Sequence, residues 1–408
     1  MPPRTLTAQC CVVGGGPAGL VAGLLLARAG VEVVVLEKHA DFLRDFRGDT
    51  IHPSTLEVMA EIGLLDGLLT LPHQKVPRLA AQFGDQLVQM ADFGSLPTRC
   101  KFIAMMPQWD FLDFLAAEGR RYPAFRLFNS AAVTELIETG ERIEGVRAAT
   151  AEGPLEVRAN LVLAADGRHS TVRAAAGFTV EELGAPMDVL WFRLSRAASD
   201  PADTMGRFDP GRIFIMINRG SYWQCAYVIP KGDHERVKAL GLDAFRRGVA
   251  AAAPFVRDRT GEIASLDDAK LLTVRVDFLP RWYRTGLLCI GDAAHAMSPV
   301  GGVGINLAIQ DAVATANLLA GPLSRGGVTP GELAQVQARR AWPTRMTQRL
   351  QLVVQDRLIR RVLDGTRNAP PPWVPFVLAW LPFLRRIPAR VIGLGFRPEH
   401  VRRPARQP

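Results

Sequence analysis

Short apolar runs, separated by glycine and polar breaks, dominate the first part of the sequence. The run 10–13 (CCVV) leads into a glycine-rich break, and a second run, 31–36 (VEVVVL), ends at an acid. Apolar runs of this length predict strands that are buried on both faces, as in a parallel sheet. Between them, residues 20–29 have the composition of a helix, and Gly30 ends it. We therefore predict a strand, a glycine turn, a helix and a second, parallel strand.

The glycine-rich break has the spacing of a dinucleotide-binding fingerprint, G-x-G-x-x-G. Gly14 permits the tight turn, Gly16 lets the backbone approach a pyrophosphate, and Gly19 lets the helix pack close to the strand. The N-terminus of the helix offers free N–H groups and a partial positive charge to phosphates. Glu37, at the end of the second strand, is placed to accept hydrogen bonds from the adenosine ribose. The fingerprint alone leaves open whether the nucleotide is FAD or NAD.

The pattern changes in the second half of the chain. Between residues 186 and 276, strand-like segments are joined by glycine, proline and aspartate turns, which predicts a second, mostly antiparallel sheet. A buried strand then returns at 285–290, and long helices follow from about 304 to 319 and from about 329 to 363. The pattern therefore predicts an α/β fold with two sheets and C-terminal helices.

Composition narrows the class of protein. The chain has 408 residues, 48% of them hydrophobic and 22% charged, which is typical of a globular enzyme of about two domains. The five cysteines include no C-x-x-C pair and no metal-ligand spacing, so we expect reduced thiols and no metal site. No signal-peptide pattern and no long uninterrupted apolar run stand out, and we expect a cytoplasmic protein.

The net charge of +9 is concentrated near the end of the chain. Residues 339–408 hold fifteen arginines, no lysine and three acids, a net charge of +12, which leaves −3 for residues 1–338. No nucleic-acid motif accompanies these arginines, so we expect no nucleic-acid partner. The apolar, proline-broken stretch 370–384 lies among them. It predicts either a helical cap packed on the second sheet or a weak contact with an anionic membrane surface, and we favour the cap.

Two later stretches add to the fingerprint. Residues 166–173 (DGRHSTVR) and 291–306 (GDAAHAMSPVGGVGIN) each follow a buried strand. In the second stretch, an acid at the strand end can hold a hydroxyl of a ribityl chain, and a proline with three glycines leaves room beside a flat ring. The helix that begins near Gly304 would direct its N-terminus at the flavin N1–C2=O edge, where reduced flavin is negative. This arrangement favours FAD over NAD.

Together the three motifs resemble the signatures of single-component FAD-dependent monooxygenases of the p-hydroxybenzoate hydroxylase type. The resemblance covers roughly residues 8–320. It implies a glutathione-reductase-like FAD domain of Rossmann type, interleaved with a β-rich substrate domain. The expected division is 1–78, 102–184 and 272–330 for the FAD domain, 79–101 and 185–271 for the substrate domain, and 331–408 for a helical, arginine-rich C-terminal segment.

The resemblance also implies a set of FAD-binding positions. Arg47 resembles an arginine that reaches the FAD phosphates, with Arg44 as the competing candidate, and Gln108 resembles a residue on the ribityl side. Asp166 resembles an acid linked to both FAD and NADPH, with Arg173 as its structural partner. The full expected set is Gly14, Gly16, Pro17, Ala18, Gly19, Glu37, Lys38, Arg47, Gln108, Asp166, Asp292, Pro299, Gly302, Gly304, Ile305 and Asn306.

The activity that the resemblance implies is hydroxylation of a small aromatic or polyketide-like substrate. NADH or NADPH reduces FAD, and a C4a-hydroperoxide of the flavin passes oxygen from O2 to the substrate. One alternative is a reductase of the geranylgeranyl-reductase type, which shares the fold and acts on a lipid-like substrate. Another is a flavoprotein without turnover that acts as a binding module. The catalytic side chains on the substrate side are not identifiable, and we expect a monomer or a homodimer.

Overall fold

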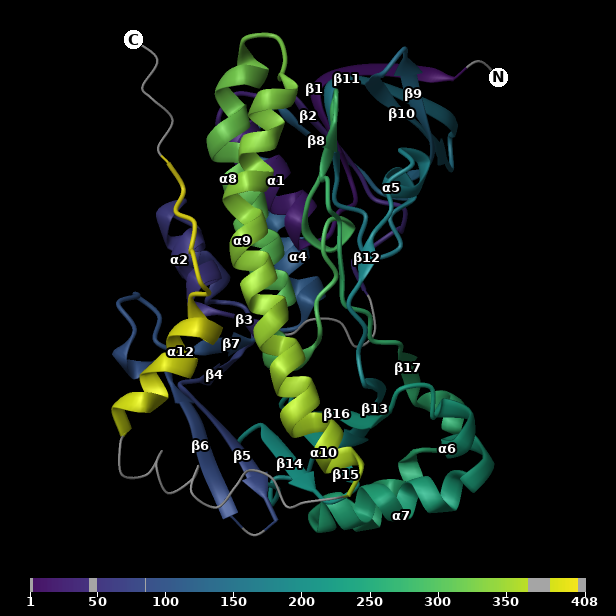
Figure 1. Ribbon diagram of the computed structural model, residues 1–408, viewed down its shortest axis with the longest axis vertical. Coiled ribbons are helices and arrows are strands. Elements are labelled where there is room, and N and C mark those ends of the chain that lie inside the picture. The colour runs from purple at the N-terminus through teal and green to yellow at the C-terminus, as the bar shows by residue number, and fades with distance from the viewer. Residues whose placement is uncertain (1–2, 44–49, 85, 366–381, 403–408) are drawn as a thin grey trace.

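The apolar runs of the sequence form a mostly parallel sheet. The computed structural model describes residues 3–43, 50–84, 86–365 and 382–402 (Figure 1). The strands of this sheet are β1 (Arg4–Val13), β2 (Val33–Leu36), β8 (Phe125–Phe128), β9 (Ala132–Thr139), β10 (Arg142–Thr150), β11 (Gly153–Ala164), β19 (Tyr283–Arg284) and β20 (Leu287–Cys289). They pair in the order β19-β20-β11-β1-β2-β8, and β10 and β9 extend the sheet from β11. Since β1, β2, β8, β11 and β20 run parallel, their carboxyl ends share one edge.

A second sheet of seven strands is antiparallel apart from one parallel pair, β14 with β5. Its strands are, in spatial order, β17 (Lys270–Leu272), β13 (Met187–Ser195), β16 (Tyr222–Pro230), β15 (Arg212–Asn218), β14 (Met205–Asp209), β5 (Arg78–Phe83) and β6 (Gln86–Asp92). Two small sheets complete the strands: β3 (Thr50–Ile51), β7 (Ile103–Met105) and β4 (Gln74–Val76) in one, β12 (Glu181–Glu182) and β18 (Asp277–Phe278) in the other. The predicted α/β fold with a parallel and an antiparallel sheet is confirmed, while the domain boundaries stay a prediction.

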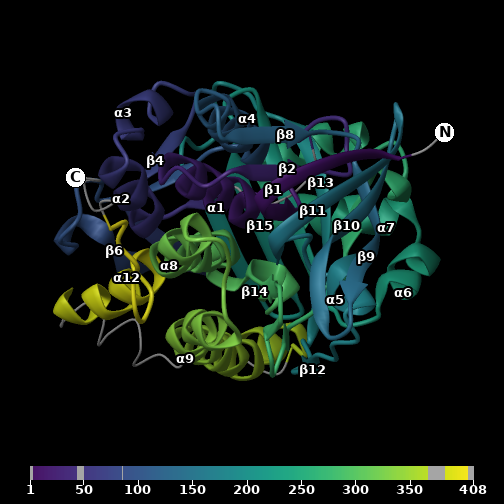
Figure 2. The same cartoon turned by 90° about the horizontal axis from the view of Figure 1, so that it is seen from above.

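The helices of the described residues pack on both sheets. The α-helices are α1 (Pro17–Arg28), α2 (Pro53–Glu61), α3 (Leu65–Leu68), α4 (Gln108–Gly119), α5 (Thr171–Ala175), α6 (His234–Leu240), α7 (Leu242–Ala252), α8 (Gly304–Ser324), α9 (Pro330–Val354), α10 (Arg360–Leu363) and α12 (Arg386–Gly393). The 3-10 helices are η1 (Phe93–Ser95), η2 (Pro254–Glu262), η3 (Leu266–Asp268), η4 (Gly291–Ala293), η5 (Val300–Gly302) and η7 (Pro382–Arg385), and η6 (Gln355–Ile359) is a π-helical turn. Figure 2 shows α1 against the sheet, α8 packed on α1, and α9 outside α8.

Two helix boundaries differ from simple expectation. Serine or threonine at 54–55 would be the usual N-cap of α2, but Pro53 occupies its first position and His52 is the cap residue. Proline is favoured there because its missing N–H would have no partner in the helix anyway. The predicted long C-terminal helix is present, but the π turn at 355–359 divides it into α9 and α10.

The parallel strands are buried on both faces, as their composition predicts. Cys10, Cys11 and Cys289 have no exposed surface, and burial raises the pKa of the Cys10 thiol to about 12.

α8 is long and apolar enough to cross a membrane by length and composition, which the sequence pattern did not indicate. However, 72% of its apolar window is buried inside the protein, and we interpret it as a core helix.

The two faces of the seven-stranded sheet have different neighbours. Leu190, Phe192 and Phe214 belong to a cluster that packs under α7 and η2. On the opposite face, Val189 and Ile213 pack with Val300, which belongs to the loop before α8, and with Ile359 of the π turn. The antiparallel sheet therefore has its outer face covered by helices and its inner face turned toward the loop before α8.

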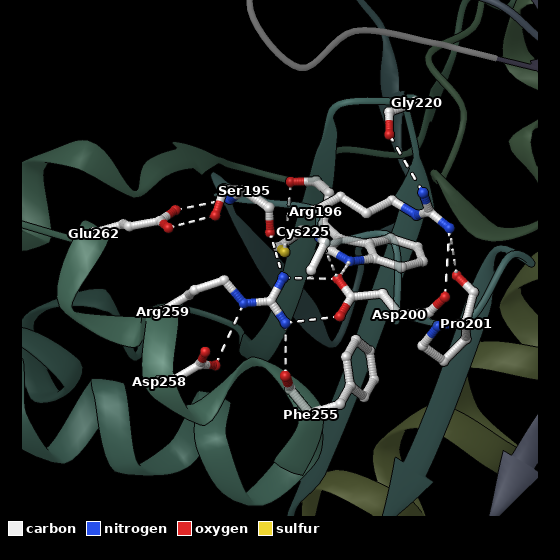
Figure 3. A network of polar contacts seen from close by, with 12 residues as sticks. Ser195, Arg196, Asp200, Pro201, Gly220, Cys225, Phe255, Asp258, Arg259 and Glu262 are labelled. Carbon is white, nitrogen blue, oxygen red and sulfur yellow. Dashed lines mark hydrogen bonds and ion pairs between the residues drawn. The ribbon is translucent and has the colours of Figure 1, made fainter.

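A buried ion pair joins the β13–β14 connection to η2 (Figure 3). The carboxylate of Asp200 accepts two hydrogen bonds from the Arg259 guanidinium, at 2.7 and 2.8 Å, and one from Trp223 Nε1, at 2.8 Å. Arg259 also donates to the carbonyl oxygens of Ser195 and Phe255. Because the Asp200 side chain is only 3% exposed, these donors stabilise its charged form, and they lower its pKa to about 2.

We predict that Asp200→Asn lowers the free energy of unfolding by about 1.5–3 kcal/mol at pH 7, because a charged acceptor of several hydrogen bonds is lost. Because the pKa of Asp200 is lower in the folded state, its ionised carboxylate stabilises the fold at pH values above the unfolded-state pKa of about 4. This stabilisation is lost as the pH falls toward 2. Urea unfolding of wild type and variant should therefore show a constant difference from pH 7 to 5 that shrinks below pH 4. A difference that stays constant down to pH 3 would contradict the assignment.

Candidate functional site

The three motifs meet at the carboxyl edge of the parallel sheet. β1 pairs with β2 on one side and with β11 on the other, and β20 pairs with β11. The backbone N–H of Ala165 donates to the Val13 carbonyl, and that of Ile290 donates to the Ala164 carbonyl, so the strand ends are in register. The residues that follow these strands therefore lie side by side, although up to 278 positions separate Gly14 from Asp292. Ligands of open parallel sheets bind at this kind of edge.

The glycine turn is packed so closely that side chains are excluded at two positions. Gly14 has φ +104°, and a Cβ on it would lie 2.4 Å from the Ala165 carbonyl oxygen. A Cβ on Gly19 would lie 1.9 Å from the Gly14 carbonyl oxygen. At Gly16, the N-cap of α1, no atom of the described residues lies within 4 Å of the corresponding position. The turn is thus closed toward the protein and open at Gly16, which leaves space for a ligand at the helix N-terminus.

Pro17 and Ala18 form the first turn of α1, directly beside this open position. Gly16 has no side chain to cap the helix, and in the part of the chain that the structure describes no side chain makes a capping hydrogen bond at this end. The first N–H groups of a helix require an acceptor from outside it. An anionic group at Gly16 would supply one and would be stabilised by the helix dipole.

Glu37 is buried and holds the glycine turn. Its carboxylate accepts hydrogen bonds from the Gly15 N–H at 2.8 Å and from the His39 N–H at 3.0 Å. The sequence predicts that Glu37 binds a ribose. The structure shows in addition that its carboxylate binds the backbone of the glycine turn. The adjacent Lys38 is exposed at the end of the same strand.

Asp166 lies at the end of β11 with one carboxylate oxygen still available. Oδ2 accepts from the Val172 N–H at 3.1 Å, whereas Oδ1 is buried without a hydrogen-bond partner among the described residues. Desolvation raises the pKa of this carboxyl group, and hydrogen bonds from Ser170 and nearby backbone partly offset the rise. A buried acceptor without a donor is unfavourable unless a ligand or water supplies one.

Arg173 links the second motif to the third. We expected it to be the partner of Asp166, but its guanidinium donates to the carbonyl oxygens of Ala293, at 3.0 Å, and Arg168, at 2.7 Å. Arg168 in turn lies 3.7 Å from the carboxylate of Asp292. The loops after β11 and β20 are therefore held together by arginines that bridge them.

The loop before α8 requires glycine by its conformation. Gly301 and Gly302 have φ values of +78° and +63°, and a Cβ on Gly302 would lie 2.4 Å from Thr50 Oγ1. Thr50 donates a hydrogen bond from that hydroxyl to the Gly302 carbonyl at 2.9 Å. Pro299 precedes these glycines, so the loop presents little side-chain bulk between β3 and the N-terminus of α8.

Gly304, Ile305 and Asn306 form the first turn of α8. Asn306 was expected to contribute its amide to a flavin, but its Oδ1 accepts from Thr55 Oγ1 at 2.7 Å and from the His52 N–H at 3.1 Å. The side chain is buried and connects α8 to the start of α2. What this turn offers to a ligand is therefore its backbone N–H groups.

The remaining expected positions are less informative. Gln108 begins α4 and is half-buried. Arg47 and the competing Arg44 lie outside the described residues, as does most of the apolar stretch in the C-terminal segment.

A buried network behind the third motif was not evident from the sequence. Asp311 of α8 accepts from His295 Nε2 at 2.6 Å and from the Gly291 N–H at 3.1 Å through one oxygen, and from Arg340 Nε at 2.9 Å through the other. Arg340 also contacts Glu399 near the C-terminus. All four side chains are at most 2% exposed. The pairing residues are 16 to 59 positions apart, so no local pattern in the sequence could reveal them.

His52 lies at the start of α2, where its backbone N–H binds the side chain of Asn306. It is fully buried, and burial lowers its pKa to about 4, while the hydrogen bond of Nδ1 to the Ile392 carbonyl, at 2.7 Å, acts in the opposite direction. It is therefore neutral at pH 7 and joins α2 to α12. A titrating role near pH 7 is not supported.

We predict that Arg340→Met destabilises the fold by about 3–5 kcal/mol, because it leaves the buried carboxylates of Asp311 and Glu399 without their shared cation. Arg339→Met is the matched control: this neighbouring arginine also binds Glu399, but its side chain is 31% exposed and the buried network keeps Arg340. Urea unfolding at pH 7 should show a loss several times larger for the first variant. Equal losses would contradict a special role for the buried network.

Comparisons with known proteins agree with this geometry. A family model described as an FAD binding domain matches residues 7–349. The chain is 32% identical over 383 residues to 6-methylpretetramide 4-monooxygenase of Streptomyces rimosus, covering 92% of this chain and 91% of that protein. It is 28% identical to digeranylgeranylglycerophospholipid reductase 1 of Methanopyrus kandleri over 73% of this chain and 76% of that protein. Some other curated relatives are longer, and the chain spans 60–61% of their length.

The fold also matches a solved structure. PqsL of Pseudomonas aeruginosa, in complex with 2-aminobenzoylacetate, superposes with a TM-score of 0.75 at 20% identity, covering 88% of this chain and 99% of that one. The family model spans most of the chain, and the relative from Streptomyces rimosus aligns over nearly its whole length. The chain therefore belongs to the FAD-dependent monooxygenases of the p-hydroxybenzoate hydroxylase type, a family that hydroxylates aromatic and polyketide substrates.

Proposed function

We propose that this protein uses FAD, NADH or NADPH, and O2 to hydroxylate a small aromatic or polyketide-like substrate. The observation that carries the proposal is the meeting of three motifs at one sheet edge, next to the inner face of the antiparallel sheet. The relative from Streptomyces rimosus, which is named as acting on 6-methylpretetramide, supports a polycyclic aromatic substrate class.

The residues at this edge fit FAD. The open position at Gly16 and the uncapped N-terminus of α1 suit the pyrophosphate, Glu37 the ribose, and the free oxygen of Asp166 a hydroxyl or amide donor. The first turn of α8 would direct its N–H groups at the flavin ring. The remaining positions proposed to bind the cofactor are Gly14, Pro17, Ala18, Gly19, Lys38, Arg47, Gln108, Asp292, Pro299, Gly302, Gly304, Ile305 and Asn306. The chemistry that FAD supplies when bound is acceptance of a hydride and activation of O2.

The inner face of the antiparallel sheet is the proposed substrate surface. Trp191 and Ile215 are partly buried on this face and pack with residues of two clusters, one containing Val300 and the other Met105. An apolar, aromatic surface next to the loop before α8 would hold a flat substrate against the flavin ring and exclude water, which favours oxygen transfer over loss of peroxide.

A cluster of cations beside the second motif is the proposed docking site for the nicotinamide nucleotide. Partial desolvation lowers the pKa of His169, and the charges of Arg275, Arg168, Arg173 and Lys38 lower it further. Arg275 and Lys38 are exposed and form no ion pair with other described residues. Cations from three separate segments would attract the phosphates of NADH or NADPH to the edge where FAD is proposed to bind.

The first experiment is turnover under ¹⁸O2 with NADPH and candidate polycyclic phenols, followed by mass spectrometry of the products. We expect NADPH-dependent incorporation of one oxygen atom from O2 into an aromatic product. The alternative is a reductase, and it predicts instead a mass gain of two hydrogens in an isoprenoid lipid, independent of O2. That outcome, or a purified protein that fails to bind FAD, would overturn the proposal.

We further predict that Arg275→Ala raises KM for NADPH about tenfold with little change in kcat, because one charge-assisted contact to a phosphate is removed. Arg247→Ala is the control, since Arg247 is an arginine of α7 on the outer side of the antiparallel sheet. Steady-state kinetics at saturating substrate measure both variants. An unchanged KM for Arg275→Ala would exclude this cluster as the docking site.

A further inference from the structure

Three buried glutamines of α9 and the π turn hold the loop before α8 from behind. Gln348 Nε2 donates to the carbonyls of Asp277, at 2.6 Å, and Ala296, at 3.1 Å. Gln351 Nε2 donates to the carbonyls of Ser298, at 3.0 Å, and Val300, at 2.9 Å. The Nε2 of Gln355 contacts the hydroxyl of Ser298. The three glutamines therefore bind the segment 296–300 along much of its length, and we refer to them as the glutamine row.

Stability alone does not explain the row. The Oε1 atoms of Gln348, Gln351 and Gln355 are all buried, and none has a hydrogen-bond partner among the described residues. The side chains themselves are at most 4% exposed. A buried acceptor without a donor is unfavourable, whereas methionine would fill nearly the same volume without that penalty. Three such glutamines along one helical segment indicate that their N–H groups are required, in spite of the free energy that the unpaired oxygens cost.

The requirement lies in the backbone orientation of the loop. Gln351 binds the carbonyls of Ser298 and Val300, the residues on either side of Pro299. The Val300 carbonyl and the Gly301 N–H belong to the same peptide group. Because a peptide is planar and trans, a Val300 carbonyl directed at α9 turns the Gly301 N–H away from α9. The row thus fixes which backbone groups the loop can present on its other side, where Gly302 contacts Thr50.

The row also connects this loop to the antiparallel sheet. Gln355 is the first residue of the π turn, and Ile359 at its other end packs with Val300 and Ile213. The Val362 carbonyl of α10 then accepts from the Gly211 N–H at 2.6 Å, in the turn between β14 and β15. π turns inside helices occur frequently at functional sites. Here the turn allows one helical segment to contact both the loop and the sheet.

We infer that Gln348, Gln351 and Gln355 are positioning residues that set the loop 298–302 for FAD and hold it at a fixed distance from the substrate sheet. The inference rests on the proposed function, since it assigns the loop to the flavin. The glutamines act through the loop that they bind, Gln348 and Gln351 through its backbone carbonyls and Gln355 through the Ser298 hydroxyl.

The test uses Gln351→Met in the full chain, with Gln335→Met as the matched control, because Gln335 lies on the same helix but is exposed. Three quantities are measured for each protein. The first is the dissociation constant of FAD from the apoprotein, and the second is the rate of hydrogen exchange of residues 298–303 with and without FAD. The third is the amount of peroxide released per NADPH oxidised. We expect Gln351→Met to keep or raise the melting temperature of the apoprotein, to weaken FAD binding about tenfold, to speed exchange in the loop and to increase peroxide release. Gln335→Met should match wild type.

The outcomes separate the inference from the proposed function. If wild type binds FAD and hydroxylates its substrate while Gln351→Met changes neither FAD affinity nor loop exchange by more than about twofold, the inference is wrong and the proposed function stands. If wild type binds no FAD, both are wrong. If Gln351→Met does not fold, Gln355→Met takes its place, since it removes only the contact to the Ser298 hydroxyl. A melting temperature that falls without a change in FAD affinity would also overturn the inference.

Discussion

The arrangement of the carboxyl edge of the parallel sheet, where the three motifs meet, depends on one buried carboxylate. Asp311 accepts hydrogen bonds from the Gly291 N–H, His295 and Arg340, and thereby joins α8 to the strand end before it and to α9. The opposing charges lower the pKa of this carboxyl group in spite of its complete burial, so it stays ionised. A charge in such a place is tolerated only when every oxygen has strong donors. The side chain of Asp311 therefore links the third motif, α8 and α9 of the C-terminal segment.

Around that carboxylate, α9 serves two parts of the molecule. Along its inner side it contacts the segment 296–300, and past the π turn its continuation packs on the antiparallel sheet. The parallel sheet places the cofactor motifs, whereas the antiparallel sheet offers an apolar surface. Within the described residues no strand of one sheet pairs with a strand of the other, so the helices near the C-terminal end carry much of the relative placement of the two sheets.

The sequence was sufficient for the strand–turn–helix–strand unit, because glycine spacing and apolar runs are local signals. It was also sufficient for the three motifs and for the two kinds of sheet. It did not reveal that Asn306 binds the start of α2, that Arg173 bridges two loops, or that Gln351 holds the loop before α8. These contacts join residues far apart in the chain, and a polar residue within a helix has the same local appearance whether it faces solvent or a buried carbonyl. Long-range pairing of polar groups therefore has to be read from the structure.

The burial of the cysteines has a consequence for a protein that handles O2. All five are buried free thiols, and desolvation raises the pKa of each one, to about 12 for Cys10. Oxidants attack the thiolate rather than the thiol, so these side chains stay protonated and are poor targets for peroxide that escapes from the active site. The fold thus protects the cysteine thiols of the protein from oxidation by peroxide.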